Sequence, residues 1–128
     1  MIAIATYVGA GLGALLAAWG FFHQLIVGAA VTLVKDLDDN SARLLVMSWV
    51  AQGAFMTFLG LLPAALLLLY GPLVPAVSAV LFLCALALLF LAGHVLVTGY
   101  ATHVKPIRIG ALIELVYGIY LLAILILL

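Results

Sequence analysis

The stretch LLPAALLLLYGPLVPAVSAV, residues 61–80, contains the turn that decides the fold. Within it, residues 71–75 (GPLVP) place one glycine and two prolines between apolar runs, a combination typical of a turn. Around this turn, residues 44–104 contain no Asp, Glu, Lys or Arg. That region is too long for a single membrane span of about 20 residues. We therefore predict two apolar helices, one on each side of the turn.

Two short clusters of charged residues bound this region. Seven of the eight Asp, Glu, Lys and Arg residues fall within 35–43 and 105–108. Beyond each cluster lies a further apolar run, and continuously apolar runs of this length indicate helices rather than the short alternating strands of a membrane barrel. Asn40 or Ser41 is expected to cap the second helix, and Asp36, Asp38 and Asp39 are expected to form a solvated loop and helix cap. The expected helices are residues 4–34, 42–70, 74–100 and 106–128.

Composition places these helices in a lipid bilayer. Hydrophobic residues make up 70% of the 128 residues and charged residues only 6%, against about 25% charged residues in a soluble domain. So short a chain cannot hide that much apolar surface from water. We predict an all-α integral membrane four-helix bundle, with residues 1–128 forming a single transmembrane domain. The net charge of zero gives no reason to expect nucleic acid as a partner.

The basic residues also predict an orientation. All four Lys and Arg residues lie in the two charged clusters, whereas the turn at 71–75 and both ends of the sequence carry none. Basic residues accumulate on the cytoplasmic side of membrane proteins. We therefore expect a multi-pass protein of the cell membrane, with both charged connections in the cytoplasm and both termini on the non-cytoplasmic side.

A short pattern occurs twice in the sequence. His-x-Leu-x-x-Gly-x-Ala is found at residues 23–30 and again at 94–101. It predicts two pseudo-symmetric helical hairpins, related by an axis along the membrane normal. His23 and His94 would then lie at equivalent depth. Chance is the alternative, because apolar sequences use few residue types.

Each predicted helix carries a polar side chain within the membrane. At the helical rise, His23 lies roughly 18 Å, His94 roughly 16 Å, Gln52 roughly 14 Å and Glu114 roughly 9 Å from the nearest charged cluster. Polar and ionisable groups at such depths are costly and mark functional sites. Helical spacing places further polar residues on the same faces. The predicted ligand-binding residues are His23, Gln24, Gln52, His94, Thr98, Glu114 and Tyr117.

This polar layer supports several functional hypotheses. The favoured one is a site that binds a small hydrophobic or cationic molecule or handles protons, as in a minimal transporter, with Glu114 as the proton-accepting or cation-pairing group. One alternative is haem b held between His23 and His94, or a metal ion held by these residues and Glu114. The sequence has no recognised metal-binding motif, so no metal ligand is assigned. A membrane enzyme acting on a lipid-soluble substrate, and a structural subunit without a site, are the remaining alternatives.

Small residues share one side of the first predicted helix. Gly9, Gly13, Gly20 and Gln24 form a seam of the kind that lets helices approach closely in lipid. The seam favours a homo-oligomer. Packing between helices of the same chain is the alternative use of the same residues.

Overall fold

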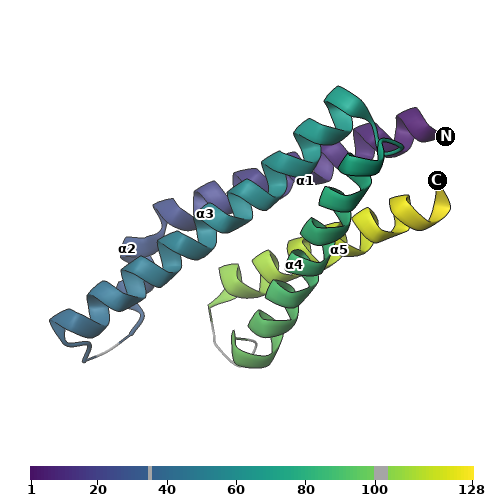
Figure 1. Ribbon diagram of the computed structural model, residues 1–128. Coiled ribbons are helices and arrows are strands. Elements are labelled where there is room, and N and C mark those ends of the chain that lie inside the picture. Colours follow the sequence, from purple (N-terminus) through teal and green to yellow (C-terminus); the bar gives the residue numbers. More distant parts are fainter. Residues whose placement is uncertain (35, 100–103) are drawn as a thin grey trace.

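The computed structural model describes residues 1–34, 36–99 and 104–128 (Figure 1). Helices α1, α3, α4 and α5 are each long and apolar enough to cross a membrane. The predicted all-α membrane four-helix bundle is therefore confirmed. A short helix, α2, follows α1. In the described part of the chain the elements are α1 (Ile2–Leu25), α2 (Val27–Thr32), α3 (Asp39–Tyr70), α4 (Pro75–Gly99) and α5 (Lys105–Leu127).

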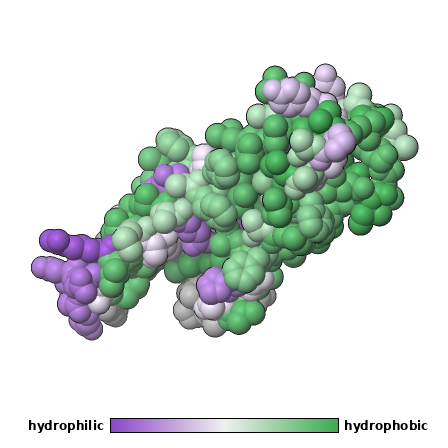
Figure 2. Space-filling view, viewed as in Figure 1, coloured by the Kyte–Doolittle hydropathy of each residue, from purple (hydrophilic) through white to green (hydrophobic). Residues whose placement is uncertain are grey.

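The long helices form two hairpins. Helix α1 packs along α3, and α4 packs along α5, while the hairpins meet mainly through α1 and α5. Both termini lie at the same end of the molecule as the turn between α3 and α4 (Figure 1). The start of α3 lies at the opposite end, where hydrophilic side chains gather beside an otherwise largely hydrophobic surface (Figure 2). We call these the terminal end and the charged end.

Paired glycines bring α1 and α3 into backbone contact. A Cβ atom added to Gly60 would lie 2.5 Å from the Gly13 carbonyl oxygen, and one added to Gly20 would lie 2.6 Å from the Gly53 carbonyl oxygen. Side chains larger than hydrogen do not fit so close an approach. The glycine seam of the first helix, Gly9 included, is buried inside one chain. The homo-oligomer stays a prediction, without the support that this seam was expected to give.

The first predicted helix, 4–34, is not continuous. Helix α1 ends at Leu25 and α2 begins at Val27, with Ile26 between them. The indole Nε1 of Trp49 donates a 2.6 Å hydrogen bond to the His23 carbonyl oxygen. In an uninterrupted helix, that oxygen accepts from the Val27 N–H. The prediction of one helix was wrong at this point because a side chain of α3 competes for a backbone acceptor of α1.

The second predicted helix begins earlier than expected. Helix α3 starts at Asp39, and its cap is Asp38 rather than Asn40 or Ser41. The Ser41 backbone N–H donates to one Asp38 carboxylate oxygen at 2.7 Å, and the Ser41 hydroxyl donates to the other at 3.2 Å. These bonds, the backbone one foremost, lower the pKa of Asp38. Helices α4 and α5 match their predicted bounds to within one residue, apart from residue 100, which lies outside the described residues.

We expect the first turn of α3 to loosen in acid. The folded-state pKa of Asp38 is lowered, so its stabilising contribution is present above the ordinary Asp pKa and is lost as the pH falls through the lowered value. Amide hydrogen exchange at Ser41 and Ala42, corrected for its intrinsic pH dependence, should accelerate below about pH 4. Asp38→Asn keeps a capping side chain without a titrating group, so it should abolish this acid response. The same acid response in both proteins would contradict the assignment.

Candidate functional site

Four buried polar atoms of the described residues have no hydrogen-bond partner. They are Trp19 Nε1, His23 Nε2, Glu114 Oε2 and the Tyr117 hydroxyl, which we call the inner polar group. All four belong to α1 or α5, the two helices through which the hairpins meet. An unpaired polar atom costs several kcal/mol in the hydrocarbon region of a bilayer. Their concentration on these two helices makes the group the first candidate site.

Contacts across α1 and α5 give the order of the inner polar group along the bundle. A Cβ atom added to Gly13 would lie 2.6 Å from the Tyr117 hydroxyl oxygen, and one added to Gly110 would lie 3.0 Å from Trp19 Nε1. Glu114 lies one helical turn after Gly110 and one turn before Tyr117. Its level is therefore between Trp19 and Tyr117. Its side chain is 1% exposed, so the carboxyl group is enclosed by protein.

His23 continues this line toward the charged end. It follows Trp19 by one turn on α1 and is 3% exposed. Its ring stacks on Trp49, with 4.2 Å between ring centroids and 5° between ring planes. The same indole donates to the His23 carbonyl oxygen. Trp49 therefore holds both the side chain and the backbone of His23. From the level of Gly13 to His23, the group extends about 15 Å along α1.

Other predicted residues line a crevice at the charged end, between α3, α4 and the start of α5. This Trp49 crevice has a volume of about 240 Å³. A second crevice, of about 320 Å³, lies between α2 and the start of α5 and is also bordered by Trp49. Trp49 is thus the residue that both crevices and His23 share. The polar side chains of the Trp49 crevice are Ser48, Gln52, His94 and Thr98.

The two histidines of the repeated pattern occupy different surroundings. His23 is buried against Trp49, whereas His94 is exposed and its ring lies 6.4 Å from that of Phe90. The two hairpins that the pattern predicts are present, but equivalent histidine environments are not.

Gln24 belongs to neither group of polar residues. Its amide nitrogen donates to the Gly20 carbonyl oxygen at 3.3 Å and to the Thr57 hydroxyl at 3.4 Å. Gln24 therefore joins α1 to α3. The predicted single layer is divided into an inner group, a crevice and this helix contact. The predicted site residues do not include Trp19, Ser48 or Trp49, although Trp19 precedes His23 by one turn on the same face.

The structure does not assemble the predicted metal ligands. Within residues 1–34, 36–99 and 104–128, no three His, Cys, Asp or Glu side chains lie close enough together to hold a metal ion. His23, His94 and Glu114 therefore do not form a two-histidine, one-carboxylate set. Haem b between the two histidines stays a prediction.

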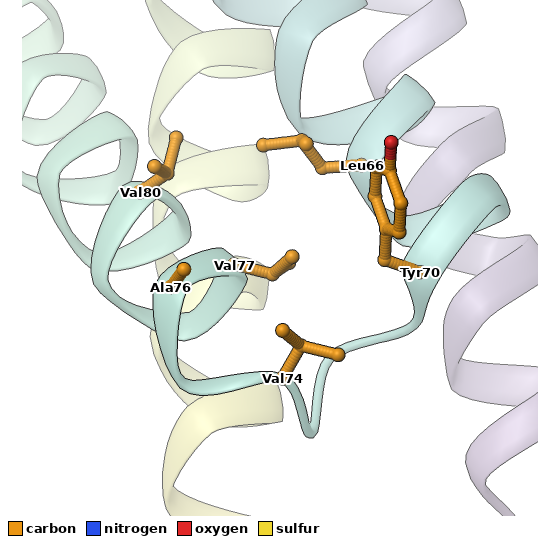
Figure 3. A pocket seen from close by; sticks show the side chains of 6 residues that line it. All are labelled: Leu66, Tyr70, Val74, Ala76, Val77 and Val80. Carbon is orange, nitrogen blue, oxygen red and sulfur yellow. The ribbon is translucent and has the colours of Figure 1, made fainter.

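An apolar pocket lies at the terminal end of the bundle, beside the turn between α3 and α4 (Figure 3). Its volume is about 270 Å³. Tyr70 contributes the one hydroxyl of the lining, and the other lining side chains are aliphatic. Tyr70 follows Trp49 by 21 residues on the same helix, or about 30 Å along its axis. This pocket contains no carboxyl or imidazole group, so we do not assign the polar chemistry to it. The lining residues are Leu66, Tyr70, Val74, Ala76, Val77 and Val80.

Comparison of the chain with protein-family models, with curated proteins and with solved structures found no match. The residues of the inner polar group and of the Trp49 crevice are therefore interpreted through their own geometry and chemistry.

Proposed function

We propose that this multi-pass membrane protein handles protons at a site inside the bundle, centred on Glu114 and His23. The observation that carries the proposal is the set of four unpaired, buried polar atoms on α1 and α5. Two of their side chains, a carboxyl and an imidazole, accept and release protons. Buried carboxylates and histidines in membrane proteins form proton relays in pumps and transporters.

The order of these groups supplies a route for the proton. Glu114 receives it deep in the bundle, on one oxygen of its carboxyl group. His23 lies nearer the charged end and exchanges a proton at Nε2, the atom that has no hydrogen-bond partner. Water bridges polar groups that are too far apart for a direct bond. Trp49 lies between His23 and the two crevices, so it controls access to this route from the charged end.

The proposal includes an orientation in the cell membrane. Arg43 stands near the start of α3, and Lys105 and Arg108 stand at the start of α5. These basic residues favour a cytoplasmic charged end. The termini and the turn between α3 and α4 would then lie on the non-cytoplasmic side. The crevices beside Trp49 would open toward the cytoplasmic half of the bilayer.

Proton flux into liposomes tests this function. Purified protein is reconstituted with a pH-sensitive dye inside, and a potassium gradient with valinomycin drives protons across the membrane. We expect Glu114→Gln to reduce the flux to that of protein-free liposomes, because the amide cannot take up a proton. The matched control is Asp36→Asn, the same carboxyl-to-amide change at an exposed residue, which should keep the wild-type flux.

Folding is checked separately in the same samples. Gel filtration and far-ultraviolet circular dichroism should give the same profile for wild type, Glu114→Gln and Asp36→Asn. If a folded Glu114→Gln variant conducted protons like the wild type, the carboxyl group would have no part in the flux and the proposal would be wrong.

A further inference from the structure

Both hydroxyl groups of the Trp49 crevice donate hydrogen bonds to backbone carbonyl oxygens of their own helices. The Ser48 hydroxyl donates to the Leu45 carbonyl oxygen at 3.0 Å. The Thr98 hydroxyl donates to the His94 carbonyl oxygen at 2.8 Å. A hydroxyl has a single proton but two lone pairs. Both side chains therefore offer hydrogen-bond acceptors to whatever occupies the crevice, one from α3 and one from α4.

The remaining polar groups of the crevice also contain acceptors. Gln52 follows Ser48 by one turn on α3, and its amide oxygen accepts hydrogen bonds. His94 precedes Thr98 by one turn on α4, and a neutral imidazole has one accepting nitrogen. Acceptors contributed by two helices fit a molecule that carries several hydrogen-bond donors on one atom.

Charge and aromatic character further define the occupant. None of the residues that line the crevice is Asp, Glu, Lys or Arg. The lining therefore places no lysine or arginine beside a bound cation. Hydrogen bonds from a charged donor are also about twice as strong as neutral ones. The indole of Trp49 also attracts cations. Val95 and Ile107 supply an apolar wall for the rest of the molecule.

We infer that the Trp49 crevice binds a small organic ammonium ion, whose N–H groups donate to Ser48, Gln52 and Thr98. Its hydrocarbon part packs against Val95 and Ile107. This inference rests on the proposed function in one respect: it names the class of solute that is bound next to the proton site. Binding itself needs the crevice and not Glu114.

Equilibrium dialysis of the full chain in detergent micelles tests the inference with three probes. Benzylammonium carries a charge and N–H donors, benzyltrimethylammonium carries the charge without donors, and benzyl alcohol is neutral. We expect benzylammonium to bind, and the quaternary ion to bind roughly tenfold more weakly, because it forms no hydrogen bonds to the crevice. Benzyl alcohol should stay at the level of empty micelles.

A matched pair of variants locates the binding. Thr98→Val removes a crevice hydroxyl at constant shape and should weaken benzylammonium roughly tenfold. Thr32→Val removes a hydroxyl that likewise donates to its own helix, to the Ala29 carbonyl at 2.7 Å, but does not line the crevice. It should keep wild-type affinity. Gln52→Leu is a second crevice variant, which should also weaken binding.

The outcomes separate this inference from the proposed function. Equal binding of all three probes, or full binding by both Thr98→Val and Gln52→Leu, would overturn the ammonium site. Benzylammonium binding that depends on Thr98, in a protein without Glu114-dependent proton flux, would retain the site and overturn the proton-handling proposal. Glu114-dependent flux without benzylammonium binding would do the reverse.

Discussion

Replacing Gly60 with leucine is expected to abolish the folded hairpin of α1 and α3. The three atoms nearest to a Cβ at this position belong to the backbone of α1: the Gly13 oxygen at 2.5 Å, the Ala17 nitrogen at 2.6 Å and the Ala17 Cα at 3.0 Å. Backbone atoms cannot move aside as a flexible side chain can, so the helices must separate. We expect Gly60→Ala to lower the free energy of unfolding by about 1–3 kcal/mol, and Gly60→Leu to yield no folded protein.

The control is a glycine on the outer surface of the same hairpin. Apart from its chain neighbours and the backbone of its own helix, nothing lies within 4 Å of a Cβ added to Gly11. Gly11→Ala should be neutral or stabilising by up to about 1 kcal/mol, because alanine favours the helix more than glycine does. Both series are measured by unfolding in mixed micelles with increasing sodium dodecyl sulfate. If Gly60→Ala and Gly11→Ala had equal stability, the backbone contact between α1 and α3 would be refuted.

Replacing Trp49 with alanine is expected to expose His23. The indole is 9% exposed, stacks on the imidazole and donates to the His23 carbonyl oxygen. Its loss should lower the free energy of unfolding by about 3–5 kcal/mol. Trp49→Phe keeps a ring but loses the N–H donor, and should lower it by about 1–3 kcal/mol. Modification by diethylpyrocarbonate, mapped by mass spectrometry, should reach His23 in Trp49→Ala and spare it in the wild type.

The control uses the other aromatic–histidine contact. Phe90 lies against His94, and both side chains are exposed. Phe90→Ala should therefore change stability by less than about 0.5 kcal/mol and leave His23 protected. Rapid modification of His23 in the wild-type protein would show that Trp49 does not control access to it.

Charge placement and the glycine–proline turn were sufficient to predict the four membrane helices. They did not predict the break at Ile26, because it depends on Trp49, which lies on another helix and more than twenty residues away. Asp38 was expected with Asp36 and Asp39 to form a loop and helix cap, but Asn40 and Ser41 are also good capping residues, and only the backbone geometry selects among them.

The candidate site was predicted in part. Four polar positions were expected to converge, yet His23 and Glu114 are buried while His94 faces a crevice. In a soluble helix, an apolar stripe shows which face points inward. Here lipid-facing and inward-facing surfaces are both apolar, so the pattern does not fix the rotation of each helix. Trp19 is an example, because the sequence of an apolar run does not show whether the N–H of an indole in it will find a hydrogen-bond partner.

The paired glycines also have a mechanical consequence. Because the backbones of α1 and α3 are in contact, few side chains between them can rearrange. We therefore expect this hairpin to move as a rigid unit. The other hairpin is tied to it at the terminal end, by the turn at 71–74 and by the Tyr120 hydroxyl, which donates to the Ala5 carbonyl oxygen at 2.9 Å. When two rigid units are joined at one end, relative displacement grows with distance from that end. We therefore expect any movement of one hairpin against the other to be largest at the charged end, around the Trp49 crevice.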